Sequence, residues 1–280
     1  MSKVFLTGAS GFVGRQVLKH VLAAGHEVTV AVRPGSMLRA GISTSNVNVV
    51  LTRDLFAERE DWWAGALVGH DTLIHAAWYV DPKTYQRSRY NFICTVGSIV
   101  MARAAARAGI GHIIGLGSCM EYRLPSTRIQ PDAPLGPSTI YSAAKLATCF
   151  ALQRHAALAG QSFTWARLFY LHGEAEKPGR LAPYIHACIA RGEHARLSAG
   201  TQLRDYLDVA EAGRMIAAIA DTRQTGIVNI CSGRPITIRL FAERIADTYG
   251  RRDLLIFSSD PIPPHDPAAV VGVCNWQAPQ

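Results

Sequence analysis

Residues 7–14 of the chain read TGASGFVG, and this stretch decides the fold. It follows a short apolar run at residues 4–7 and opens a helical pattern over residues 12–24, which is the order that a dinucleotide-binding loop requires. Gly8 permits a tight turn, Gly11 lets the backbone approach a pyrophosphate, and Gly14 allows close packing of the helix on the strand. Because the helix N-terminus also offers N–H groups to phosphates, we expect cofactor contacts from Gly8, Ser10, Gly11, Phe12, Val13 and Gly14.

Outward from this loop, short β-type runs alternate with longer helical patterns up to residue 168, which is typical of a parallel, doubly wound sheet. The expected strands are residues 4–7, 27–32, 46–51, 72–75, 112–117 and 162–168, and the expected helices are residues 12–24, 89–108 and 139–159. After Arg167 the helices become shorter, with isolated strand candidates at residues 227–230 and 254–257. We therefore expect an α/β protein with a Rossmann-type core in residues 1–168. A smaller C-terminal substrate-binding lobe is expected in residues 169–280, with some segments returning to the core.

The composition fits a packed globular protein, with 49% hydrophobic and 18% charged residues. The net charge of +8 is spread over many segments, which suits an anionic small molecule or a surface tuned for solubility, and we expect no nucleic-acid partner. No apolar run reaches the roughly 18 residues that a membrane span needs, so we expect a cytoplasmic protein with no membrane partner. The six cysteines lack metal-like spacing, which predicts buried thiols and no metal site.

Arg33 and Ser36 follow the second expected strand, and no acidic residue stands nearby. An NAD-selective site presents a carboxylate here to the ribose hydroxyls, whereas the 2′-phosphate of NADP requires a cation. Arg33, with Ser36 as a further donor, predicts NADP(H) as the preferred cofactor. NAD(H) is the alternative if Arg33 is only a solvated loop residue. The turns after the third and fourth strands flank the adenine and nicotinamide ends, so we also expect cofactor contacts from Asp54, Leu55, Ala76 and Ala77.

Tyr141 and Lys145 stand four residues apart on an expected helix, so both side chains project from one face. A free tyrosine has a pKa of about 10, and a neighbouring ammonium with an oxidised nicotinamide favours the phenolate. Tyr141 can then take a proton from an alcohol or return it to a ketone, while Lys145 also binds the cofactor ribose. Ser118 can donate to the substrate oxygen beside Tyr141. Together with the glycine loop, these three residues predict an oxidoreductase.

The sequence resembles the extended short-chain dehydrogenase/reductase family, in particular its NAD(P)-dependent branch of nucleotide-sugar epimerases, dehydratases and reductases. The resemblance covers nearly the whole chain. Its carriers are TGASGFVG at residues 7–14, DL at 54–55, HAA at 75–77, Asn91, Ser118, YSAAK at 141–145, RLFYLHG at 167–173 and GTQLRDYLDV at 200–209.

The resemblance implies a nucleotide-sugar substrate. The segment matching residues 200–209 belongs to the family's lid over a nucleoside diphosphate, so Arg204 is expected to contact phosphate, as a guanidinium can pair two of its oxygens. The alternative is that Arg204 pairs with Asp205 or Asp208 in a structural network. Tyr170 stands where the family often has a substrate-touching Asn. Substrate contacts are expected from Ser118, Cys119, Tyr170, Arg180 and Arg204.

Departures from the family pattern narrow the chemistry. Dehydratases place an Asp–Glu pair where this chain has Cys119 and Met120, and members that epimerise and then reduce use a Cys near Met120 and a His near Arg180. Ketone reduction needs neither pair. The resemblance therefore implies an NADPH-dependent reductase of a nucleoside-diphosphate 4-keto-6-deoxyhexose, with the proton from Tyr141. The alternatives are an NAD(P)-dependent nucleotide-sugar 4-epimerase and a non-catalytic NADP-binding regulator. A homodimer paired through residues 89–108 and 139–159 is expected, as among relatives.

Overall fold

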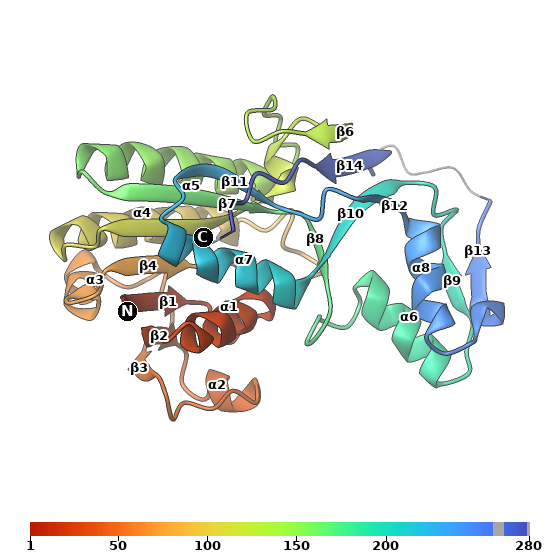
Figure 1. Ribbon diagram of the computed structural model, residues 1–280, viewed down its shortest axis with the longest axis horizontal. Coiled ribbons are helices and arrows are strands. Elements are labelled where there is room, and N and C mark those ends of the chain that lie inside the picture. Colours follow the sequence, from red (N-terminus) through yellow and green to blue (C-terminus); the bar gives the residue numbers. More distant parts are fainter. Residues whose placement is uncertain (260–265, 279–280) are drawn as a thin grey trace.

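A parallel sheet of seven strands forms the centre of the computed structural model, which describes residues 1–259 and 266–278 (Figure 1). The strand order is β11-β7-β5-β4-β1-β2-β3. The strands are β1 (Lys3–Thr7), β2 (Glu27–Val32), β3 (Asn48–Leu51), β4 (Thr72–His75), β5 (His112–Ser118), β7 (Ser162–Leu168) and β11 (Gly226–Ile230). Every neighbouring pair is parallel, and the predicted Rossmann-type α/β fold is confirmed.

The expected strands are present, with shifts of one or two residues at several ends. β3 begins at Asn48 rather than at residue 46, because its pairing with β2 starts opposite Thr29. β5 continues one residue further than expected, to Ser118, because Ser118 still pairs with Leu168 of β7. The candidate catalytic serine is therefore the last residue of a central strand.

Alternating side chains of β1 build the two cores of the Rossmann part. Val4 and Leu6 pack into the core shared with α1 (Phe12–Ala23) and α7 (Val209–Thr222). Phe5 packs into the opposite core, which is shared with α3 (Glu60–Leu67), α4 (Tyr90–Arg107) and α5 (Ile140–Leu158). This alternation is the strand period of two, and it buries both faces of the sheet. A single helical turn, α2 (Ser36–Arg39), follows β2.

A second sheet and a small cluster of elements lie beside the Rossmann part, and except for β6 they follow β7 in the chain. The second sheet has the order β12-β10-β14-β6, with β8 also paired to β10. Its strands are β6 (Ser126–Ile129), β8 (Tyr170–His172), β10 (Leu203–Asp208), β12 (Pro235–Thr237) and β14 (Ala269–Gly272). Figure 1 places the remaining elements at one end of the molecule; they are α6 (Leu181–Ala190), β9 (Ala195–Leu197), α8 (Ile238–Asp247) and β13 (Leu255–Phe257).

The chain after residue 168 also contributes to the Rossmann core. Helix α7 packs on α1, and β11 forms the sheet edge beside β7. Residues 209–230 and Trp276 therefore belong to the first core. The second sheet and the elements α6, β9, α8 and β13 build the smaller lobe.

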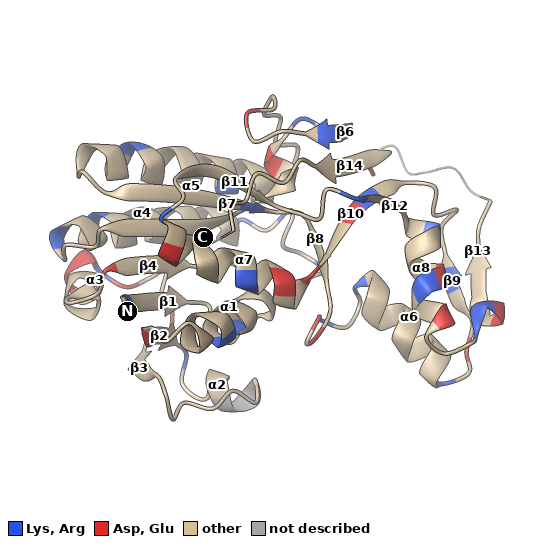
Figure 2. Ribbon diagram, in the orientation of Figure 1, with Lys and Arg blue, Asp and Glu red and all other residues tan. Residues whose placement is uncertain are grey.

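Charged residues of both signs are scattered over both parts of the molecule, and no single region holds the net charge of +8 (Figure 2). Within residues 1–259 and 266–278, none of the helices combines the length and the apolar character needed to cross a bilayer.

Candidate active site

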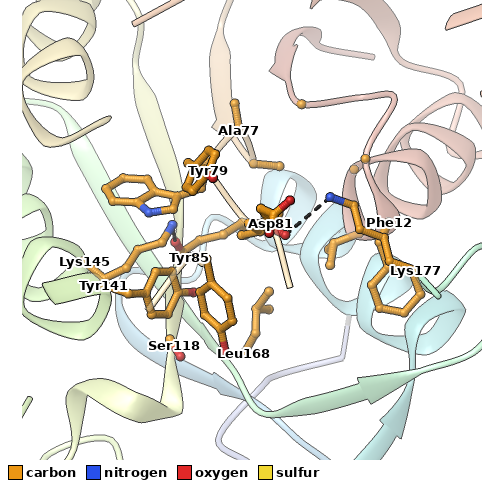
Figure 3. Close-up of a pocket in the computed structure, with 18 of the residues that line it drawn as sticks. Phe12, Ala77, Tyr79, Asp81, Tyr85, Ser118, Tyr141, Lys145, Leu168 and Lys177 are labelled. Carbon is orange, nitrogen blue, oxygen red and sulfur yellow. Dashed lines mark hydrogen bonds between the residues drawn. The ribbon is translucent and has the colours of Figure 1, made fainter. Parts of the chain in front are cut away.

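A cavity of about 740 Å³ opens at the carboxyl ends of the sheet strands. Figure 3 shows Ser118, Tyr141 and Lys145 on one side of this cavity and Phe12 and Lys177 on the other. The cavity brings together predicted residues from distant parts of the sequence. Those that line it are Gly8, Ser10, Gly11, Phe12, Val13, Gly14, Arg33, Asp54, Leu55, Ala76, Ala77, Ser118, Cys119, Tyr141, Lys145, Tyr170 and Arg180.

The glycine loop packs against the turn after β4 with no room for side chains. Gly8 has a φ of +76°, and a Cβ there would lie 2.7 Å from the Ala77 nitrogen. A Cβ on Gly14 would lie 2.0 Å from the Gly8 carbonyl oxygen. Helix α1 begins directly after Gly11, which caps it without a side chain, and its first turn holds no acidic residue. The positive end of α1 therefore faces the cavity, and this cradle fits the pyrophosphate of a dinucleotide.

Two exposed arginines line the cavity near the ends of β2 and β3. Arg33 follows β2 and was predicted, whereas Arg53 follows β3 and was missed. The carboxylate of neighbouring Asp54 already accepts hydrogen bonds from the Tyr90 hydroxyl and the Phe56 N–H. This part of the cavity wall therefore carries two cations beside a carboxylate that is already hydrogen-bonded.

His75, the last residue of β4, orders the turn that carries Ala76 and Ala77. Its Nδ1 lies 2.8 Å from the Thr7 hydroxyl and its Nε2 lies 2.9 Å from the Ser98 hydroxyl. The Thr7 hydroxyl in turn accepts from the Ala77 N–H at 3.2 Å. Burial, together with the Lys145 charge, lowers the pKa of His75 to about 3, so the ring is neutral and acts as scaffold.

A reciprocal cap starts helix α5 and sets the position of the two predicted catalytic residues on it. Thr139 accepts a hydrogen bond from the Ser142 N–H, and the Ser142 hydroxyl accepts one from the Thr139 N–H. This capping box fixes the first turn of the helix. Tyr141 and Lys145 then project one helical turn apart from the same face into the cavity.

The Lys145 ammonium is held inside the protein. Its Nζ donates to the Leu116 carbonyl oxygen at 2.7 Å and lies 3.8 Å from the ring centroid of Trp78. Burial lowers the pKa of Lys145 to about 7, and the charge of Glu121 opposes that decrease. Lys145 therefore changes its protonation state near neutral pH.

The Tyr141 hydroxyl lies beside Ser118, and the surroundings of the phenol raise its pKa. Burial, with a further contribution from Tyr85, raises the pKa of Tyr141 above its usual value, and the hydrogen bond with Ser118 opposes this only in part. The Tyr85 ring packs edge-on against Tyr141 at 4.9 Å between centroids. The Tyr141 phenol is therefore protonated near neutral pH and can act as a proton donor.

The opposite wall of the cavity is built by the turn between β8 and α6. Glu176 is almost fully buried, and its carboxylate pairs with Arg180 at 3.4 Å. The Lys177 ammonium donates to the Val80 carbonyl oxygen at 3.3 Å, across the cavity entrance (Figure 3). Arg180 and Lys177 thus supply positive charge where the smaller lobe meets the Rossmann part.

Two predicted residues do not line the cavity. Ser36 is buried, and its hydroxyl has no hydrogen-bond partner among the residues that the structure describes. Arg204 is also buried, because its guanidinium pairs with Asp266 and donates to the Leu203 and Pro267 carbonyl oxygens. The structure therefore places Arg204 in a structural network, as the alternative interpretation held, although with Asp266 rather than with its neighbours in sequence.

Sequence reasoning missed the aromatic residues around the catalytic set. Trp78 lies under Lys145, and its Nε1 donates to the Asn91 side chain at 2.8 Å. The Asn91 amide donates in turn to the Tyr85 carbonyl oxygen. The only signal for Trp78 in the sequence is its place directly after the residues 75–77 turn.

Residues 4–231 match the family described as the NAD dependent epimerase/dehydratase family. The chain belongs to this family. Its predicted membership of the extended short-chain dehydrogenase/reductase group is thereby confirmed, as is its class, an NAD(P)-dependent enzyme of that type.

Three similar proteins show the range of this NAD dependent epimerase/dehydratase family. A dTDP-6-deoxy-L-talose 4-dehydrogenase (NAD(+)) of Aggregatibacter actinomycetemcomitans is 24% identical over 275 residues, covering 96% of this chain and 98% of the relative. A dTDP-6-deoxy-L-talose 4-dehydrogenase (NAD(P)(+)) of Kitasatospora kifunensis is 28% identical over 270 residues, covering 89% of this chain and 80% of the relative. A solved UDP-N-acetylglucosamine 4-epimerase of Methanobrevibacter ruminantium M1 shares the fold, with a TM-score of 0.86, 20% identity and coverage of 98% and 90% of the two chains.

The buried state of Lys145 predicts a rise of stability with pH in the cofactor-free protein. Below pH 7 both the folded and the unfolded chain carry the ammonium, whereas between about pH 7 and 10.5 only the unfolded chain retains the proton. The unfolded state binds more protons in that window, so stability rises with pH. Relative to Lys145→Met, the wild-type free energy of unfolding should increase by up to about 1.4 kcal/mol per pH unit. Urea unfolding of both proteins at pH 6 to 9.5 measures this. If the difference between their free energies of unfolding does not change with pH, the lowered pKa of Lys145 is contradicted.

Proposed function

We propose that the protein is an NADPH-dependent reductase of a nucleoside-diphosphate 4-keto-6-deoxyhexose. The observation that carries the proposal is the Tyr141 hydroxyl beside Ser118 in the cavity, one helical turn from Lys145. The next two positions after Ser118, which hold an acidic pair in dehydratases, are Cys119 and Met120. Burial raises the pKa of Cys119 to about 12, so this thiol does not take up or release a proton near neutral pH, and Met120 has no proton to give.

The residues of the chain divide the reaction between binding and proton transfer. A cofactor bound in the glycine-loop cradle would supply the hydride. The N-terminus of α1 would hold the pyrophosphate, and Arg33 with Arg53 would hold the 2′-phosphate. Ser118 donates a hydrogen bond to the ketone oxygen, and Tyr141 gives that oxygen its proton. Hydride and proton together convert the ketone to an alcohol.

The names of two relatives support the choice of substrate. Both are 4-dehydrogenases of a 6-deoxyhexose carried on dTDP, and the reverse of a 4-dehydrogenation is the reduction of a 4-ketone. Because the Arg204 guanidinium is occupied by Asp266, we assign the diphosphate to Arg180 and Lys177. These two cations line the cavity on the side of the smaller lobe.

We also propose a homodimer formed by α4 and α5, which pack against each other in the Rossmann part. Their outer faces carry large apolar side chains that are 46% to 60% exposed in a single chain. Covering such a surface with a second copy removes it from water. The side chains are Phe92, Ile93, Val96 and Phe150.

Tyr141→Phe should abolish turnover and leave NADPH affinity within about twofold, because the ring stays and only the proton donor is lost. The measurement is NADPH consumption with a panel of nucleoside-diphosphate keto sugars, alongside fluorescence titration of cofactor binding. The wild type should oxidise one NADPH for each alcohol formed. Interconversion of sugars with no net change in NADPH would identify an epimerase. Cofactor binding without turnover of any keto sugar would favour a regulator.

Arg33→Ala and Arg53→Ala should each weaken NADPH binding about tenfold or more and leave NADH binding nearly unchanged, because each removes a charge-assisted bond to the 2′-phosphate. Arg59→Ala is the matched control, since Arg59 is also an exposed arginine but does not line the cavity. Dissociation constants for both cofactors decide the matter. A wild type that binds NADH more tightly than NADPH would refute this assignment.

Val96→Glu and Phe150→Glu should convert a two-chain particle into a single chain, because each places a carboxylate in the apolar contact between copies. Val68→Glu is the control, since Val68 is 66% exposed and lies outside both helices. Light scattering after size-exclusion chromatography gives the mass. A wild type that elutes as one chain at micromolar concentration rules the dimer out.

A further inference from the structure

A fully buried carboxylate lies directly behind the catalytic serine. Glu121 closes the short 3₁₀ turn Cys119–Glu121, and its side chain is 0% exposed. Its Oε1 accepts the Ser118 backbone N–H at 2.8 Å, and its Oε2 accepts the Arg167 Nε–H at 2.8 Å. The Trp165 indole N–H lies 3.1 Å from both oxygens. Each carboxylate oxygen therefore has its own hydrogen-bond donor, and the two oxygens share the Trp165 N–H as a third.

The same strand end is also held by the catalytic ammonium. Lys145 Nζ binds the Leu116 carbonyl oxygen, and Glu121 binds the Ser118 N–H two residues later. The two charges thus grip opposite ends of one short backbone segment at the end of β5. Gly117, between them, allows this approach, because a Cβ there would lie 2.6 Å from Glu121 Oε1.

Glu121 is also the carboxylate that acts on Lys145 most strongly. Its charge raises the pKa of Lys145 against the effect of burial, and it raises the pKa of Tyr141 as well. Arg167 offsets part of this charge. The titratable groups that surround Lys145 and Glu121 from the neighbouring elements are His75, Cys94, Cys119, Tyr122, Tyr141, Cys149 and Arg167.

We propose that Glu121 is a positioning residue of the reaction: its carboxylate fixes the backbone of Ser118 and supplies the buried negative charge that stabilises the Lys145 ammonium. It touches neither substrate nor cofactor. This inference rests on the proposed function, because it takes Ser118, Tyr141 and Lys145 as the catalytic set.

Glu121→Gln removes the charge while leaving an oxygen that can accept the Ser118 N–H. Without the charge, Lys145 and Tyr141 both lose their protons at lower pH. The high-pH limb of kcat for ketone reduction should therefore move to lower pH by about 0.5 to 1 unit. A second measurement needs neither cofactor nor turnover. The free energy of unfolding is compared between Glu121→Gln and the same variant that also carries Lys145→Met. The pH at which their difference begins to rise should be lower than for the wild type by the same amount.

Tyr122→Phe is the matched control. It removes the buried hydrogen bond from the Tyr122 hydroxyl to Asn229, 2.7 Å long, on the same segment without changing a charge. It should lower the melting temperature and leave the pH limb in place. Glu121→Asp retains the charge but draws it back, so its limb should lie between those of the wild type and Glu121→Gln.

If Glu121→Gln keeps the wild-type limb, or loses activity without moving it, the residue is structural and the proposal is overturned. If Glu121→Gln does not fold, Glu121→Asp decides by whether its limb is displaced while that of Tyr122→Phe is not. Failure of the proposed function has a different signature, namely full turnover by Tyr141→Phe or Lys145→Met. If those two variants lose turnover but Glu121→Gln keeps the wild-type high-pH limb, the positioning role of Glu121 is refuted and the proposed function is not.

Discussion

The hydrogen bond from the Lys145 ammonium to the Leu116 carbonyl oxygen joins helix α5 to the end of β5, and the catalytic side of the cavity depends on it. It fixes the height of the helix against the strand, so Tyr141, one turn earlier, meets Ser118 at the strand end. Removing an ammonium from water costs several kcal/mol, which the carbonyl, the Trp78 ring and the Glu121 charge offset only in part. The remaining cost is what brings the pKa of Lys145 near neutrality.

The cofactor side of the cavity depends on a different feature. Here uncharged main-chain segments approach each other closely. Gly8 and Gly14 admit neighbouring main chain where any Cβ would collide, and neutral His75 ties β1 to β4 through Thr7. A charged histidine in this place would repel the ammonium of Lys145. The low pKa of His75 and the protonated Lys145 are therefore compatible with each other.

Local features of the site could be predicted from the sequence, because each depends on a spacing within one element or one turn. The glycine loop and the four-residue separation of Tyr141 and Lys145 are of this kind, and the structure places all of these residues at the cavity. Contacts between distant segments could not be predicted. Arg204 is paired with Asp266, 62 residues away, and Trp78 lies against Lys145 with its indole N–H bound to Asn91. Nothing in the residue types alone distinguishes these partners from solvent.

Arg204 is engaged in the second sheet, and for this reason the proposed reaction assigns the phosphate contact to other residues. Buried Asp205, beside it on β10, accepts the Ser232 N–H and hydroxyl and the Gly233 and Gly272 N–H groups. The pair of charges on β10 thus ties together the strands of the smaller lobe, and buried charges with this many partners are costly to release.

Arg180, on the turn between β8 and α6, does not tie strands together in this way. Arg180 pairs only with Glu176 among the described carboxylates, and its side chain is 41% exposed. A substrate diphosphate can compete for an exposed guanidinium at far lower cost than for a buried one. In the proposed reaction, binding of the substrate diphosphate by Arg180 would therefore depend on the fold of this turn, which starts at β8 and is joined to Val80 by the hydrogen bond from Lys177.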